Sequence, residues 1–266
     1  MLFKWSLLFR SLPFAILVLL LKLIATEVFS FEGLLELSEI AIFMTSGIFL
    51  LGFMLAGTLS DYKESERVPG EIACILEALE ETAVMLSVKA GYSVQHARQE
   101  VFILGNNIVE CFHKRIKTSE LHERLYKFNQ LIIDLDHAGA AATIVGSRLM
   151  GELSNLRRLL TRANVISRTG FLATGYALLE LVLLILAILF ICAKFKNLLA
   201  QVVITAFITL LYTYMYQLIR DIDDPFEYHH RTPSNGATEV SLFPLQEYLE
   251  RAEKRLDLEE RPTPQV

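Results

Sequence analysis

Two charged residues lie inside long apolar stretches of the sequence, and they are the first candidates for chemistry. Glu180 lies near the middle of one stretch and Lys22 nearer the end of another. A charge at the centre of a bilayer costs roughly 2.5–3.5 kcal/mol on insertion scales. Glu180 must therefore face other helices or a watery path, or be protonated, whereas Lys22 can extend its ammonium toward the interface. The functional interpretation is a pore-lining or proton-relay site. The structural alternative is a Lys22–Glu180 pair, or a polar contact to one of three tyrosines: Tyr212, Tyr214 or Tyr216.

A second candidate is an acidic run that follows the last apolar stretch. Carboxylate oxygens are the ligands that Ca²⁺ prefers, but the run lacks the regular spacing of an EF-hand loop. A helix cap followed by a solvated turn is the favoured interpretation. The four residues are Asp221, Asp223, Asp224 and Glu227. The adjacent His229 and His230 could bind a transition metal, although neighbouring histidines in a polar loop are usually exposed to solvent.

Motifs for catalysis and cofactor binding are absent from the sequence. It contains no P-loop, GxGxxG, HExxH or GxSxG pattern and no Cys/His set with metal-ligand spacing. The three cysteines, Cys74, Cys111 and Cys192, are too widely spaced for a disulfide framework. A net charge of −5 gives no basic field for nucleic acid. We therefore expect neither an enzyme nor a nucleic-acid-binding protein.

The elements that must position these residues are long apolar runs. The chain has 266 residues and is 53% hydrophobic, against about 45–50% for an ordinary soluble domain. The runs are long enough to cross a hydrocarbon core, and they must be helical because backbone polar groups in lipid have to be paired. The expected spans are residues 11–29, 40–57, 171–193 and 198–219. The basic leader invites a signal-peptide interpretation, but the length of the first run and the missing cleavage site favour a retained anchor.

Basic residues near the span ends predict the orientation of the chain. They precede the first span, follow the second, precede the third and follow the fourth, as Lys4, Lys63, Arg168 and Arg220 illustrate. The loop of residues 27–39 has no basic residue, and the pair formed by Lys194 and Lys196 is outnumbered. We expect both termini and the region between spans two and three to be cytoplasmic, in a plasma or inner membrane.

The chain is expected to divide into four parts: a first transmembrane hairpin (1–57), a cytoplasmic helical region (58–170), a second transmembrane hairpin (171–219) and a cytoplasmic tail (220–266). The region 58–170 shows helical periodicity throughout, with Gly91 and Gly105 as candidate breaks. Its first helix carries glutamates, Glu80 among them, opposite an apolar face, and its last leads into the third span. The tail should hold one amphipathic helix from near Pro244. The sequence predicts an all-α, multi-pass membrane protein with four transmembrane helices and a cytoplasmic helical bundle.

The second span carries a stripe of bulky side chains on one helix face. Thr45, Phe49 and Phe53 recur at every fourth residue, and Gly52 and Gly57 allow other backbones to approach closely. In a symmetric oligomer, repetition of this stripe about an axis would form a narrow apolar constriction from which water is easily lost. Ordinary helix–helix packing is the simpler interpretation of the pattern taken alone.

The pattern resembles the bestrophins and the smaller bestrophin-like membrane proteins. The segment 47–58, with Leu51-Gly52-Phe53 at its centre, resembles the bestrophin neck helix. The sequence Asp223-Asp224-Pro225-Phe226 is similar to the acidic Pro-Phe turn that follows the last bestrophin span. Four spans, an inside helical region and inside termini also agree. The resemblance covers most of the chain by architecture and a smaller part of it by motif.

Membership of such a family implies a pentameric anion channel, with Phe49 and Phe53 in the neck and Thr45 one turn above. It also implies a Ca²⁺ clasp at the acidic tail. The expected partners are the lipid bilayer, further copies of the chain and inorganic anions such as chloride. Two other functions stay open. One is a membrane-anchored scaffold or sensor whose cytoplasmic bundle binds a partner, with no permeation path. The other is a proton-coupled transporter that uses Glu180.

Overall fold

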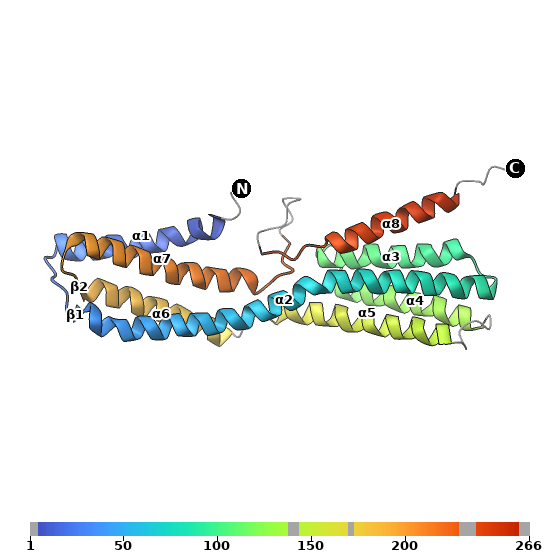
Figure 1. The fold of residues 1–266 in the computed structure, drawn as a ribbon, viewed down its shortest axis with the longest axis horizontal. Coiled ribbons are helices and arrows are strands. Elements are labelled where there is room, and N and C mark those ends of the chain that lie inside the picture. The colour runs from blue at the N-terminus through green and yellow to red at the C-terminus, as the bar shows by residue number, and fades with distance from the viewer. Residues whose placement is uncertain (1–4, 138–143, 170–172, 229–237, 261–266) are drawn as a thin grey trace. The chain divides into compact units, whose positions relative to one another are not determined.

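The computed structural model describes residues 5–137, 144–169, 173–228 and 238–260. These residues form eight α-helices and one pair of two-residue strands, labelled in Figure 1. They fall into two compact units. The first contains residues up to Lys63 and Thr169–Pro225, and the second contains Glu64–Arg168 and most of the chain from Phe226 onward. Helix α2 (Leu37–Ala90) contributes residues to both units.

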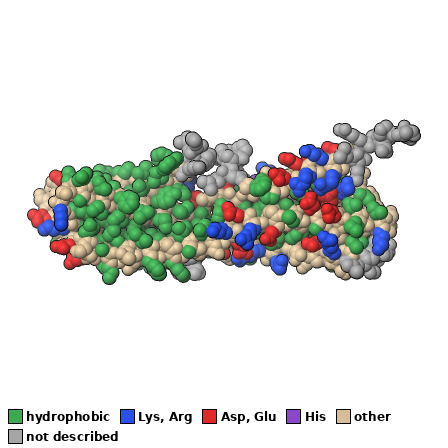
Figure 2. Space-filling view, viewed as in Figure 1, with side chains coloured by type: hydrophobic (Ala, Val, Ile, Leu, Met, Phe, Trp, Pro, Cys, Tyr) green, Lys and Arg blue, Asp and Glu red, His purple; other side chains and the backbone are tan. Residues whose placement is uncertain are grey.

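The first unit is built from α1 (Ser6–Glu27), the first part of α2, α6 (Ala173–Cys192) and α7 (Leu198–Ile222). Within the described residues, these four helices are long and apolar enough to cross a membrane. Hydrophobic side chains cover the outside of this unit, which Figure 2 shows as a broad green area. Such a surface suits lipid rather than water. The prediction of an all-helical, multi-pass membrane protein with four spans is confirmed.

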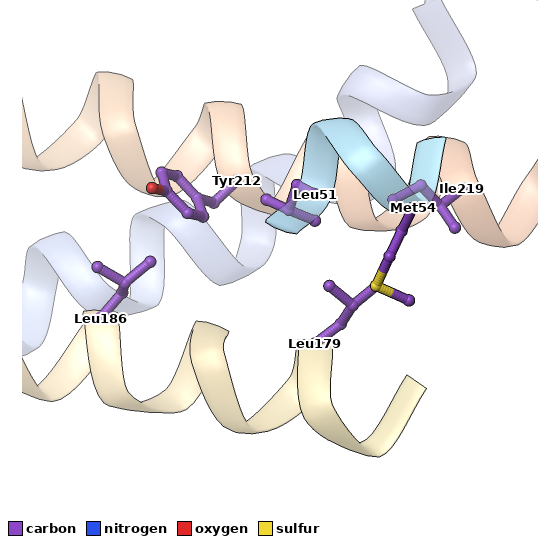
Figure 3. Close-up of a cluster of buried hydrophobic side chains, with 6 residues drawn as sticks. All are labelled: Leu51, Met54, Leu179, Leu186, Tyr212 and Ile219. Carbon is purple, nitrogen blue, oxygen red and sulfur yellow. The ribbon is translucent and has the colours of Figure 1, made fainter. Parts of the chain in front are cut away.

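Buried side chains from α2, α6 and α7 form a core in the first unit, shown in Figure 3. The six residues drawn are Leu51, Met54, Leu179, Leu186, Tyr212 and Ile219. A Cβ at Gly47 would lie 2.9 Å from the Tyr212 ring, so glycine at this position lets α2 and α7 approach closely. The Tyr212 hydroxyl donates to the backbone carbonyl of Met44. These contacts hold one face of α2 against α7.

The two hairpin turns of the first unit lie against each other. Strand β1 (Leu35–Glu36) pairs in parallel with β2 (Ala193–Lys194), an element that the helical periodicity does not predict. Gly33 has a φ of +89°, and a Cβ there would lie 2.6 Å from the Ala193 carbonyl oxygen. Both the backbone conformation and the available space therefore require glycine. The loop between spans one and two is tied in this way to the turn between spans three and four.

The second unit contains the remainder of α2 with α3 (Val94–Phe112), α4 (Thr118–His137), α5 (Ile144–Arg168) and α8 (Phe243–Glu260). Gly91 has a φ of +67° just after α2, and Ser93 caps α3 by accepting from the His96 amide. The prediction of a break at Gly105 is wrong, because this residue lies inside α3. A Cβ there would come within 2.9 Å of Leu249, so Gly105 lets α8 pack closely. Residues 170–172, where a helix would lead from the bundle into the third span, lie outside the described residues.

Glu80 departs from the predicted amphipathic pattern of α2. Its place opposite the apolar face predicts exposure, but the residue is 5% exposed. Two hydrogen bonds from Arg255, of 2.8 and 2.5 Å, and one from the Tyr248 hydroxyl, of 3.1 Å, bind the carboxylate. Both of these donors belong to α8, and the guanidinium of Arg98 in α3 lies 3.7 Å from the same carboxylate. A buried carboxylate is tolerated only with such partners, because desolvation of an unpaired charge costs several kcal/mol.

Candidate functional site

One face of α2 carries the predicted stripe, and this face is exposed. The side chains of Phe49 and Phe53 are 77% and 74% exposed, and Thr45, one turn earlier, is exposed as well. The Thr45 hydroxyl donates to the Ala41 carbonyl at 2.9 Å, so the helix itself satisfies this polar group. The three residues therefore share one outward surface of a single helix in the first unit.

The opposite face of α2 is part of the core in Figure 3. Leu51 and Met54 are 2% and 4% exposed there, against α6 and α7. On the outward side, a Cβ at Gly52 or Gly57 would meet no atom within 4 Å. Within the described part of the chain, these two glycines do not bring helices together. The helix thus has one side that holds the unit together and another that is available to a neighbour from outside the chain.

The outward face of α2 differs in composition from the outward faces of α1 and α6. The exposed large side chains in the middle of α1 and α6 are aliphatic, for example Ile16, Leu20, Leu181 and Ile188. On α2, the two phenylalanines alternate with glycine, alanine and hydroxyl-bearing residues. Aliphatic surfaces suit lipid chains, whereas small and hydroxyl-bearing positions in a span are typical of protein contacts. The stripe is therefore less like a lipid-facing surface than the outward faces of α1 and α6 are.

A basic residue, Lys63, continues the stripe at the end of the first unit. Lys63 lies about five turns after Thr45 at 3.6 residues per turn, and so on the same side of α2. It is exposed. The positions between them on that side are Phe49, Gly52, Phe53, Ala56 and Ser60. From the sequence, Lys63 contributes only to the predicted membrane orientation. The helical register is the signal that could have added it to the stripe.

Lys22 is buried and bound by backbone carbonyls. Its side chain is 1% exposed, and Nζ donates to the carbonyl oxygens of Ile191 at 3.1 Å and Ala193 at 2.5 Å. These carbonyls lie at the C-terminal end of α6, where backbone acceptors lack helical partners and the helix dipole favours a cation. The ammonium also lies 5.6 Å from the centre of the Phe195 ring. Lys22 therefore caps a helix rather than pairing with Glu180.

Glu180 accepts a hydrogen bond from the Tyr216 hydroxyl at 2.7 Å, which joins α6 to α7. This is one of the structural alternatives that the sequence left open. The two side chains line a hollow of about 380 Å³ in the first unit. Its other lining residues are Tyr176, Arg220, Asp223 and Asp224. Among the described residues, the side chain that binds Glu180 thus belongs to α7 and not to the stripe on α2.

Two of the acidic tail residues bind partners in the first unit. Asp221 accepts from the Thr238 hydroxyl at 2.6 Å and lies 3.8 Å from the guanidinium of Arg10. Asp223 accepts from the Tyr176 hydroxyl at 2.8 Å. These hydrogen bonds connect the end of α7 to the polypeptide around it. The run therefore has a structural role at the end of the fourth span.

The acidic run is not gathered into a metal site. Asp224 is half-buried and Glu227 is exposed. In the part of the chain that the structure describes, no group of three His, Cys, Asp or Glu side chains is placed to hold a metal ion. His229 and His230 lie outside the described residues. The arrangement of these side chains does not fit the Ca²⁺ clasp that the family resemblance implies.

Comparisons with known proteins give matches in structure but not in sequence. No protein-family model and no curated protein matches the chain. A single-residue variant of the bacterial bestrophin homologue from Klebsiella pneumoniae superposes with a TM-score of 0.78 at 15% identity, over 94% of this chain and 98% of the other. Another crystal structure of that homologue gives 0.72 at 14% identity, over 96% and 98% of the two chains. A structure described as a membrane protein also gives 0.72, over 96% and 100%. The chain therefore has the fold of the bacterial bestrophin homologue.

Proposed function

We propose that the chain is one subunit of a homo-oligomeric, bestrophin-like ion channel that conducts anions. The outward face of α2 in each copy turns toward the axis of the ring. Thr45, Phe49 and Phe53 then form the neck, and Lys63 stands at one end of it. The single observation that carries this proposal is that the stripe is exposed while the opposite face of the same helix is in the core. The shared fold supports the proposal.

The neck would act through its apolar character. Rings of phenylalanine side chains around a narrow axis exclude water, so an ion must lose part of its hydration to pass. The edges of aromatic rings carry positive partial charge, which favours anions over cations where edges point at the path. Lys63 adds a positive charge at the end of the same helix face, and a charge at the mouth of a pore raises the local anion concentration. Both effects favour anion conduction.

The orientation follows the positive-inside rule. We place Lys63 and Arg168 on the cytoplasmic side, together with both termini, the second unit and the tail. The turn that joins α6 to α7 then lies on the other side of the membrane. A thiol reporter in E32C tests this layout, because Glu32 lies in the same loop with 85% of its side chain exposed and should be labelled only from outside.

Recording from purified protein in planar lipid bilayers tests the channel. We expect F49A and F53A each to raise unit conductance several-fold, because truncation widens the neck and lets water in. The matched control is F43A, since Phe43 is 52% exposed on the same helix but lies on another side of it. The proposal fails if the neck variants conduct like F43A. A monomer without currents that retains a soluble partner would instead support the membrane-anchored scaffold.

A further inference from the structure

The second unit contains a cavity with a volume of about 460 Å³, beside the turn that joins α3 to α4. Residues from the end of α3, the start of α4, the last turns of α5 and Phe226 line it. Its volume is within the range of about 300–1,000 Å³ that is typical of small-molecule sites. All of its lining residues belong to this unit, whereas the stripe on α2 belongs to the first unit.

The cavity combines an apolar wall with a basic edge. Phe112, Leu121, Leu160 and Phe226 supply apolar surface, and the rings of Phe112 and Phe226 lie 5.2 Å apart between centres. Three cationic residues also line it, namely Lys114, Lys117 and Arg168. None of the described residues that line the cavity is acidic, although the whole chain has a net charge of −5. This concentration of one charge sign points to an anionic ligand.

The start of α4 adds to the positive potential. Thr118 is the first residue of this helix and lines the cavity, so the backbone amides of the first turn and the positive end of the helix dipole lie beside it. Arg168 Nη2 donates to the Thr118 hydroxyl at 3.4 Å, which places the guanidinium at the same end of the cavity. Glu120 in the first turn offsets part of the dipole but does not line the cavity. The charged end and the apolar wall together define an amphiphilic site.

We propose that this cavity binds a small amphiphilic organic anion, with a carboxylate or phosphate head at Lys117, Arg168 and the start of α4. The apolar body of the ligand lies against the aromatic and leucine side chains. Every residue that would bind this ligand belongs to the second unit. The site therefore stands independently of the proposed channel.

Cys111 provides a direct probe, because it lines the cavity and is a free thiol. Burial raises the pKa of this thiol, so alkylation is slow and sensitive to any further shielding. Purified full-length protein in nanodiscs is treated with N-ethylmaleimide at alkaline pH, and each cysteine is followed by peptide mass spectrometry. We expect 4-phenylbutyrate to slow alkylation of Cys111 in a saturable way and to leave the exposed Cys74 unchanged.

Three further compounds separate the parts of the ligand. 4-Phenylbutyl phosphate tells a phosphate head from a carboxylate, and protection by either supports the site. 4-Phenylbutanol lacks the charge and inorganic phosphate lacks the apolar body, so we expect neither to protect. Protection by the alcohol equal to that by the acid would overturn the proposal, as would equal protection by phosphate. If no compound changes the rate of Cys111 alkylation, the proposal is also overturned, even where a neighbouring subunit occupying the cavity is the cause.

A charge variant completes the test. We expect K117Q combined with R168Q to weaken protection at least about tenfold, since charge-assisted contacts to the head group are lost. The control is R115Q, because Arg115 lies in the same turn, pairs with Glu110 at 2.8 Å and does not line the cavity. Equal affinities in the two variants would contradict the assignment. If Cys111 does not alkylate at all, ligand-observed NMR with the same compounds and variants decides in its place.

Discussion

The ammonium of Lys22 lies 2.5 Å from the carbonyl oxygen of Ala193, between the first span and the turn after the third. The same nitrogen is bound to the Ile191 carbonyl, and Gly33 contacts Ala193 from the other hairpin. The end of α6 is thus bound by α1 and by the loop that joins α1 to α2. This junction positions α6, against which the core face of α2 packs.

Replacement of Lys22 by methionine tests this junction. K22M keeps the length of the side chain but leaves the two carbonyls without their donor in an apolar environment. We expect a loss of about 1–3 kcal/mol of stability, seen as a lower midpoint of thermal unfolding in detergent. The control is K194M, because Lys194 is 58% exposed and its contact to Glu32 is 3.9 Å long. Equal midpoints for the two variants would remove the structural role from Lys22.

The Glu80 carboxylate should anchor the C-terminal helix in the second unit. E80A leaves Arg255 and Tyr248 without their shared acceptor. The expected loss is about 2–4 kcal/mol, below the full cost of breaking a buried pair, because about a third of the Arg255 side chain is exposed. Burial and the nearby carboxylate raise the pKa of Tyr248, which keeps the phenol protonated and able to donate. Hydrogen exchange of the α8 amides should rise in E80A and stay unchanged in E81A, since Glu81 is exposed. An unchanged α8 in E80A would show that the helix is held by apolar contacts alone.

Lys63 should influence the selectivity of the channel. Reversal of its charge in K63E places a ring of negative charge at the end of the neck, so the anion-to-cation permeability ratio should fall several-fold. Reversal potentials in asymmetric KCl measure this ratio. K63R keeps the charge and should behave like the natural protein. A ratio that does not change in K63E would mean that this face of α2 does not border the ion path.

Glu180 distinguishes the channel from a proton-coupled transporter. The carboxylate is bound by Tyr216 between α6 and α7, away from the stripe. We therefore expect E180Q to leave unit conductance and its pH dependence unchanged, while the loss of the charge alters stability only. Loss of a pH-dependent flux in E180Q would support the transporter instead. Y216F removes the same hydrogen bond without touching the carboxyl group and separates the two effects.

The fold class could be predicted because uninterrupted apolar runs and a period of 3.6 are local properties of the sequence. The residues 40–57 and the amphipathic tail are examples of such local patterns. Contacts between distant segments could not be predicted in the same way. The sequence places Glu80 on the polar face of α2, but α8 covers this residue in the structure. Gly105 is predicted as a helix break, but it lies inside α3 with Leu249 packed against it. Lys22 binds backbone carbonyls, and the order of side chains in a sequence does not indicate which carbonyls a lysine will bind.

The residues of the candidate site were chosen from local patterns of the same kind. The common face of Thr45, Phe49 and Phe53 follows from the register of one helix, which the sequence contains, but the exposure of that face does not. The acidic run gave a less reliable prediction, because the hydrogen bonds of Asp221 and Asp223 come from Thr238 and Tyr176 in other segments. The assignment of carboxylates to a metal needs their separation in space, and sequence spacing does not supply it.

The claim that α2 lines an ion path is tested most directly by thiol block of current in a cysteine-free background. A water-soluble, charged methanethiosulfonate reagent is applied to F49C and, as the matched variant, to F43C during bilayer recording. We expect the current through F49C to fall and the current through F43C to persist, because in the proposed channel only the stripe borders the ion path. Persistent current in F49C, or block confined to F43C, would contradict the proposed neck.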